Sequence, residues 1–263
     1  MLALEPVQYL LGGASGTLVG FTLGLVGGGG SILAVPLMVY LVGVPSPHIA
    51  IGTSALAVAA NAAANLVPHA RAGNVKWRCA GIYAAAGVGG AWIGSSLGKA
   101  FDGEKLLFLF ALLMLVVGVM MLKGRDATGN PQVQLTREMA PRIVGFGAAT
   151  GLFSGFFGIG GGFLIVPGLI ASTGMPMLNA VGSSLVAVTA FGLTTSINYA
   201  GSGLIDWPLA AVFIAGGIVG GLVGTVVAKR LSRQKGLLNT VFAGLIFAVA
   251  AYMLWQSAMA FWG

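Results

Sequence analysis

Two stretches of this chain are too long and too free of charge for a water-soluble fold. No formally charged residue occurs between Glu5 and Arg71, or between Arg142 and Asp206. Each interval holds about three lengths of roughly 20 residues, and an α-helix needs one such length to cross a hydrocarbon core of about 30 Å. The chain is 57% hydrophobic and 7% charged, with a mean hydropathy of +0.96. We therefore predict an integral membrane protein.

Shorter uncharged intervals extend this pattern over the rest of the chain, and each is long enough for one crossing. They lie at residues 79–98, 106–122, 207–228 and 236–263. The sum is ten hydrophobic segments, five on each side of a polar stretch. We predict an all-α membrane protein with a first transmembrane repeat at 1–122, a linker at 123–142 and a second transmembrane repeat at 143–263.

The two halves repeat one another in sequence. GLVGGGGSILAVP at 24–36 matches GFFGIGGGFLIVP at 155–167, at a spacing of 131 residues. After a shift of one residue, GTSALAV at 52–58 matches GSSLVAV at 182–188. The match covers nearly the whole of each half, so we expect a duplicated structure.

The placement of Lys and Arg predicts how the two halves are oriented. The loop near Arg71, the linker at 123–142 and the loop near residue 232 are basic, so the positive-inside rule places them in the cytoplasm. Corresponding loops of the two halves then lie on opposite faces, which requires an odd number of crossings in each half. We therefore predict inverted-topology repeats of five segments each, with both termini outside the cytoplasm.

Each glycine cluster is followed by a short apolar segment, at 31–42 and at 163–172, that is too brief to cross the bilayer unaided. We predict two half-helices, because many secondary transporters bind substrate where discontinuous helices meet near the midplane. The first N–H groups of a helix have no intrahelical acceptor and carry the positive end of its dipole. Glycine also lets a ligand approach the backbone closely. Two anion cradles are therefore expected, and close helix packing is the alternative use of these glycines.

The candidate substrate-binding residues come from the glycine clusters, from the hydroxyls of the GTS and GSS motifs, and from one amide in an apolar segment. They are Gly28, Gly29, Gly30, Ser31, Thr53, Ser54, Asn61, Gly160, Gly161, Gly162, Ser183 and Ser184. The motif hydroxyls have helix capping as an alternative role. The amide has hydrogen bonding between helices as its alternative.

Several function classes lack the residues that they need. The segments show no nucleophile–base pair, no paired carboxylates and no cluster of metal ligands, so we expect neither an enzyme nor a cofactor. No Asp or Glu lies deep in a segment, so proton coupling would have to use His48 or His69 and stays open. The basic residues sit in short loops, where topology and anionic lipid headgroups account for them, so nucleic acid is not an expected partner. Glycine-rich faces at 87–98 and 216–224 can pack the repeats together or form a homodimer.

Two motifs carry a resemblance to a known family. They are GLVGGGGSILAVPLMVYLVGVP with a downstream AIGTSAL, and GFFGIGGGFLIVPGLIASTGMP with a downstream AVGSSL. Over essentially its full length, the chain resembles the sulfite exporter TauE/SafE family. The resemblance implies a bacterial or archaeal inner-membrane protein that moves sulfite, a sulfonate, thiosulfate or a related small anion.

We therefore expect a secondary transporter that holds a small sulfur oxyanion or sulfonate at the half-helix N-termini and works by alternating access. One alternative is an anion channel with the glycines as its filter. Another is an accessory membrane subunit without transport of its own.

Overall fold

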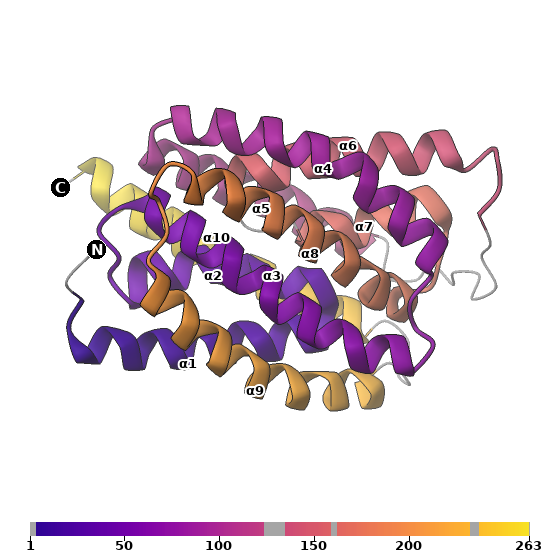
Figure 1. The fold of residues 1–263 in the computed structure, drawn as a ribbon, viewed down its shortest axis with the longest axis horizontal. Coiled ribbons are helices and arrows are strands. Elements are labelled where there is room, and N and C mark those ends of the chain that lie inside the picture. Colours follow the sequence, from indigo (N-terminus) through magenta and orange to yellow (C-terminus); the bar gives the residue numbers. More distant parts are fainter. Residues whose placement is uncertain (1–3, 124–134, 159–161, 232–236, 263) are drawn as a thin grey trace.

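Helices make up nearly all of the part of the chain that the computed structural model describes, which comprises residues 4–123, 135–158, 162–231 and 237–262. Within these ranges the helices are joined by short loops, and there are no strands (Figure 1). In chain order the helices are α1 (Pro6–Val26), η1 (Gly27–Leu33), α2 (Ala34–Pro36), η2 (Leu37–Leu41), α3 (Pro47–Arg71), α4 (Trp77–Ala100), α5 (Gly103–Lys123), α6 (Ala140–Phe157), α7 (Gly162–Thr173), α8 (Met177–Ala200), α9 (Trp207–Leu231) and α10 (Leu237–Trp262).

Within the described residues, four helical stretches are long and apolar enough to cross a membrane. They are Pro6–Leu41, Pro47–Arg71, Met177–Ala200 and Trp207–Ala228. This confirms the predicted all-α membrane class. The division into ten segments, the inverted arrangement and the bounds of the repeats stay predictions, and residues 124–134 of the predicted linker lie outside the described residues.

Proline and side-chain caps set the starts of several helices. Pro6 and Pro47 occupy the first turns of α1 and α3, where a backbone N–H would have no intrahelical partner. In α1 the backbone N–H of Glu5 donates to Oε1 of Gln8 over 2.8 Å, as in a capping box. Nε2 of Gln8 also donates to the carbonyl of Val42 over 2.9 Å, which ties the start of α1 to the end of η2.

Glycines with positive φ end the helices, and they occur in pairs at the repeat spacing. The pairs are Gly27 with Gly158, Gly43 with Gly174, and Gly73 with Gly203. The first two pairs are 131 residues apart and the third is 130 apart. Residues other than glycine rarely adopt this backbone conformation. The sequence repeat is therefore also a repeat of backbone breaks.

Helix packing repeats in the same way. α1 packs along α9, and α6 packs along α4. A methyl group on Gly20 of α1 would overlap the carbonyl of Gly217 of α9, and one on Gly151 of α6 would overlap the carbonyl of Gly87 of α4. Small residues let membrane helices approach this closely. Many of the glycines thus serve packing, which the sequence left as the alternative to ligand binding.

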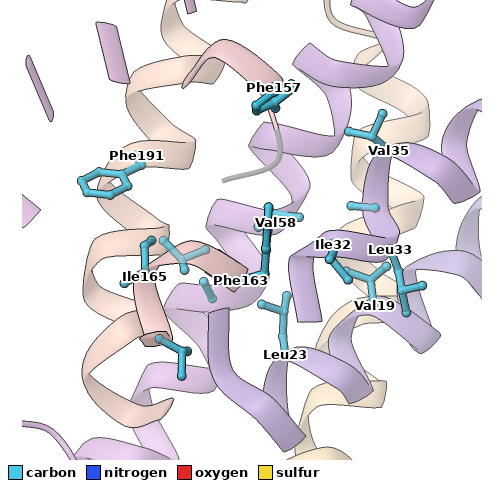
Figure 2. Close-up of a cluster of buried hydrophobic side chains, with 14 of the residues drawn as sticks. Val19, Leu23, Ile32, Leu33, Val35, Val58, Phe157, Phe163, Ile165 and Phe191 are labelled. Carbon is cyan, nitrogen blue, oxygen red and sulfur yellow. The ribbon is translucent and has the colours of Figure 1, made fainter. Parts of the chain in front are cut away.

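The centre of the molecule is formed by α3 and α8, which pack against each other. They lie between the α1–α9 pair along one edge of the bundle and the α4–α6 pair along the other (Figure 1). In the close-up of the core, Val58 of α3 lies between Ile32 of η1 and Phe163 of α7 (Figure 2). The segments that follow the two glycine clusters therefore reach the same buried core.

The predicted half-helices are found with one correction. In the second half α7 covers Gly162–Thr173, within one residue of the predicted 163–172 at each end. In the first half the predicted start at residue 31 is wrong, because the glycine run itself forms the 3₁₀ helix η1. α2 and the π-helical turn η2 then continue the segment. Glycine permits the tighter i→i+3 hydrogen bonding of a 3₁₀ turn, so the break at Gly27 starts a new helix at once.

Candidate functional site

The two glycine clusters meet at one point in the centre of the protein. η1 packs against α7, and a methyl group on Gly162 would overlap the carbonyl oxygen of Gly28. Cα of Gly162 lies 2.7 Å from the position that a Cβ on Gly28 would take. Both residues are buried. The structure therefore joins the two predicted cradles, while Gly160 and Gly161 lie outside the described residues.

Ser184 of α8 connects the second half to the glycine run of the first half. The backbone N–H of Gly28 donates to Oγ of Ser184 over 2.9 Å, and this hydroxyl donates to the carbonyl of Val181 over 2.8 Å. Oγ of Ser31 donates to the carbonyl of Gly28 over 2.8 Å. The backbone N–H and the carbonyl of Gly28 therefore each have a serine partner. We call Gly28, Ser31, Gly162 and Ser184 the central cluster.

The electrostatics of the central cluster come from backbone and hydroxyl dipoles. Its four residues are uncharged, and Ser31 and Ser184 have no solvent exposure. A first turn of a 3₁₀ helix has N–H groups without intrahelical acceptors, and here Ser184 occupies the one on Gly28. An anion oxygen that reached this point would compete with the serine for that N–H group. The arrangement suits weak binding of an anion by dipoles.

Two other predicted residues link the halves elsewhere. Oγ1 of Thr53 accepts the backbone N–H of Asp206 over 2.9 Å, and Oγ of Ser183 accepts the backbone N–H of Lys76 over 2.9 Å. The donors precede α9 and α4, and the two bonds occupy matching positions of the repeat. The alternative that these hydroxyls cap their own helices is wrong, since the N-cap of α3 is Ser46 and that of α8 is Pro176, well before them.

Ser54 and the remaining glycines stay close to their own segments. Oγ of Ser54 donates to the carbonyl of Ile51 over 3.0 Å. Gly29 and Gly30 are buried in η1, and Gly30 packs against Thr22 of α1, whose Oγ1 donates to the carbonyl of Gly30 over 3.2 Å. Thr22 has no counterpart among the predicted site residues, and no motif in the sequence points to it.

Asn61 lies in the interface between α3 and α9. Its side chain is fully buried against Gly217, and neither its Oδ1 nor its Nδ2 has a hydrogen-bond partner among the described residues. Its carbonyl accepts Nδ2 of Asn65 over 2.9 Å, and Oδ1 of Asn65 accepts the Thr225 hydroxyl over 3.3 Å. Asn65 therefore forms a hydrogen bond between helices, whereas the Asn61 side chain, for which this was the predicted alternative role, forms none among the described residues. An unpaired buried amide costs about 1–3 kcal/mol, so the free amide of Asn61 is available to a ligand or a water molecule.

His69 lies one helical turn beyond Asn65 and touches the end of α1. Its Nε2 is 3.3 Å from the carbonyl oxygen of Gly24, and its Nδ1 is 3.5 Å from Nδ2 of Asn74. A neutral ring with the proton on Nε2 satisfies both contacts. The sequence placed His69 near a segment end, and its full burial beside the first glycine break becomes evident only in the structure.

No group of three or more His, Cys, Asp or Glu side chains that could hold a metal ion lies among the described residues. Lys99 at the end of α4 is a partly buried cation. Its Nζ donates to the carbonyl and Oδ1 of Asn198 over 3.0 and 2.7 Å, and to Oγ of Ser202 over 2.8 Å. The three hydrogens of this ammonium group are thus used, which fits a structural tie between α4 and α8.

Comparison with known proteins gives a consistent set of similarities. A family model described as Sulfite exporter TauE/SafE matches residues 12–253. A Xylella fastidiosa (strain 9a5c) protein named "Probable membrane transporter protein" is 57% identical, covering 92% of this chain and 94% of its own. A Bacillus subtilis (strain 168) protein named "Probable membrane transporter protein YdhB" is 27% identical, covering 87% and 96%. No solved structure matches this chain.

Proposed function

This chain belongs to the sulfite exporter TauE/SafE family of membrane transporters, and we propose that it is a secondary transporter for a small sulfur-containing anion of the sulfite, sulfonate or thiosulfate class. The observation that carries the proposal is the contact of the two glycine clusters at Gly28 and Gly162, joined by the bond from Gly28 to Ser184. Elements of both halves converge on it, as in carriers that bind substrate between repeats.

The chemistry of the central cluster matches such an anion. Sulfite and sulfonate groups present several oxygens that accept hydrogen bonds in a compact group. The N–H of Gly28 and the hydroxyl of Ser184 are both donors, and they are bonded to each other in the described state. Separation of η1 from α8 frees the N–H of Gly28 for an anion without a buried counter-ion, and the Ser184 hydroxyl, which donates to Val181 in the described state, can turn to donate to the same anion. Weak, dipole-based binding also favours release on the other side.

We propose inverted repeats and alternating access as the architecture behind this site. The paired helix breaks support it, as do the α1–α9 and α4–α6 interfaces and the matched bonds of Thr53 and Ser183. One half rocks against the other about the α3–α8 contact and exposes the central cluster to each side in turn. The protein then lies in a bacterial or archaeal inner membrane with both termini outside the cytoplasm.

Flux through purified protein in liposomes tests the proposal. The panel comprises sulfite, thiosulfate, sulfoacetate, taurine, sulfate and acetate, each with and without a proton gradient. We expect saturable uptake of one sulfur-containing anion, and acceleration by the gradient would establish proton coupling. Anion flux that is far faster than carrier turnover and does not saturate would indicate a channel in place of a carrier. Absence of flux from folded protein would replace it with an accessory subunit.

A further inference from the structure

A groove of about 530 Å³ lies between α3 and α9. Its lining includes Asn65, Val67, Pro68 and Arg71 of α3, and Ile218 and Leu222 of α9. None of these residues belongs to the central cluster. The volume is in the range of binding sites for small molecules.

The body of the groove faces the hydrocarbon of the bilayer. Val67, Ile218 and Leu222 are 48%, 43% and 60% exposed, and they belong to two of the helices that are apolar and long enough to cross a membrane. In a bilayer, such side chains contact acyl chains. The occupant of the groove therefore has an apolar part.

One end of the groove is basic. Arg71 is the last residue of α3, is exposed, and forms no ion pair with a carboxylate in the described part of the chain. α3 and α9 run in the same direction, since Asn61 packs against Gly217 and Asn65 against Gly221. The C-terminal end of α9, with exposed Arg230, therefore lies on the same side of the membrane as Arg71.

Asn65 adds a neutral donor beside this basic end. Its side chain is 3% exposed and lines the groove, and one hydrogen of its Nδ2 is used by the Asn61 carbonyl. An amide nitrogen carries two hydrogens, so the second remains for a phosphate or ester oxygen.

The matching interface of the other half is tied by a side chain, so the two interfaces differ in this region. At the repeat spacing of 130, Leu222 corresponds to Trp92 and Pro68 to Asn198. Nδ2 of Asn198 donates to Oγ of Ser95 over 2.6 Å and to the carbonyl of Trp92 over 3.3 Å, which ties α8 to α4. Proline has no side-chain donor to make this tie between α3 and α9.

We propose that the α3–α9 groove binds one anionic phospholipid, with its phosphate on Arg71 and an acyl chain along Val67, Ile218 and Leu222. Basic sites between membrane helices recognise anionic headgroups through charge, and the apolar body selects a lipid over a small hydrophilic anion. This site lies outside the central cluster and does not depend on the transported substrate.

Native mass spectrometry of the purified full chain tests this site, with added phosphatidylglycerol or phosphatidylcholine of identical acyl chains. We expect one phosphatidylglycerol to be retained in preference to phosphatidylcholine. Arg71→Gln should weaken retention about fivefold, the effect of one basic residue near a membrane surface. Leu222→Trp, which introduces the larger side chain found at the matching position 92, should fill the groove and abolish retention. Arg78→Gln is the matched control, because it removes an equal charge from an exposed position outside the groove, and retention should not change.

Four results would overturn the site. Equal retention of both lipids would show that the headgroup charge is not recognised. Unchanged retention in Leu222→Trp would show that the lipid does not bind in the groove. Equal losses in Arg71→Gln and Arg78→Gln would indicate diffuse charge in place of a site. Displacement of the lipid by millimolar sulfite or sulfoacetate would assign the groove to the substrate instead. Thermal melting of each variant shows whether it is folded. Anion flux of each variant in liposomes measures transport separately from lipid binding.

Discussion

At the scale of single residues, the same residue type has two different tasks in this protein. Gly20 and Gly151 let neighbouring helices touch, whereas Gly28 and Gly162 bring the two halves together at the central cluster. Composition alone does not separate these tasks, because each depends on which backbone lies opposite. Single substitutions distinguish them.

We predict that Gly162→Ala reduces transport strongly, because the added methyl group overlaps the carbonyl of Gly28 and η1 must move away from α7. Overpacking of this kind costs about 1–3 kcal/mol of stability. Gly145→Ala is the control, since nothing lies within 4 Å of its added Cβ. Flux in liposomes and thermal melting measure both variants. Normal flux in Gly162→Ala would contradict a functional contact between the glycine clusters.

We predict that Ser184→Ala weakens anion binding and lowers stability, because it leaves the buried N–H of Gly28 without its acceptor and removes a donor. The cost of such an unpaired group is about 1–3 kcal/mol. Thr194→Ala, on the same helix, removes a hydroxyl whose donation goes to the carbonyl of Ala190 in its own helix, and it should change little. Substrate titration of both proteins gives the comparison, and equal affinities would remove Ser184 from the site.

At the scale of elements, helix ends and helix contacts come in matched pairs. The break at Gly27 ends α1 as the break at Gly158 ends α6, and the interfaces of these helices with α9 and α4 correspond. Thr53 and Ser183 extend the correspondence, because each accepts an N–H at the start of a helix in the opposite half. Matched elements should respond alike to matched changes.

We expect Gly20→Ala and Gly151→Ala to lower the melting temperature by similar amounts. Each added methyl group meets a backbone carbonyl of the facing helix, which cannot move without separating the pair. Gly89→Ala serves as the control in α4, because its added Cβ meets nothing within 4 Å and alanine favours the helix. A loss in only one of the two glycine variants would show that the interfaces are not equivalent.

At the scale of the whole molecule, the repeat relates two halves that touch at their centre and differ at their surface. The central cluster takes residues from both halves, whereas the α3–α9 interface holds a groove at a level where Asn198 ties the matching α8–α4 interface. The predicted inverted orientation of the halves states which side of the membrane each loop faces. Labelling from the two sides of the membrane tests it.

In a Cys79→Ser background, we predict that a cysteine at Ala72 reacts with an impermeant thiol reagent only from the cytoplasmic side. A cysteine at Gly201 should react only from the opposite side. Both positions are exposed and follow corresponding helices, α3 and α8. Vesicles of both orientations supply the two sides, and lysed vesicles supply the control for full reactivity. Labelling of both positions from one side would establish parallel repeats.

Much of the fold follows from the sequence, because hydropathy and backbone freedom are local properties. The uncharged intervals predict membrane helices, and the glycine runs predict breaks that occur at Gly27 and Gly158. α7 agrees with prediction within one residue at each end. The start of the first short segment was misplaced, since a glycine run can either interrupt a helix or form a 3₁₀ turn, and local sequence does not distinguish these.

The sequence by itself determined the membrane class, the helices, the repeat and the candidate glycines. Only the tertiary structure decided that Gly28 meets Gly162, that Ser184 reaches Gly28 across 156 positions, and that Thr53 and Ser183 serve opposite helix starts. The physical reason is that membrane insertion and helix breaks depend on residues that are close together in the sequence. The partner of a buried N–H or hydroxyl depends on which helices pack together.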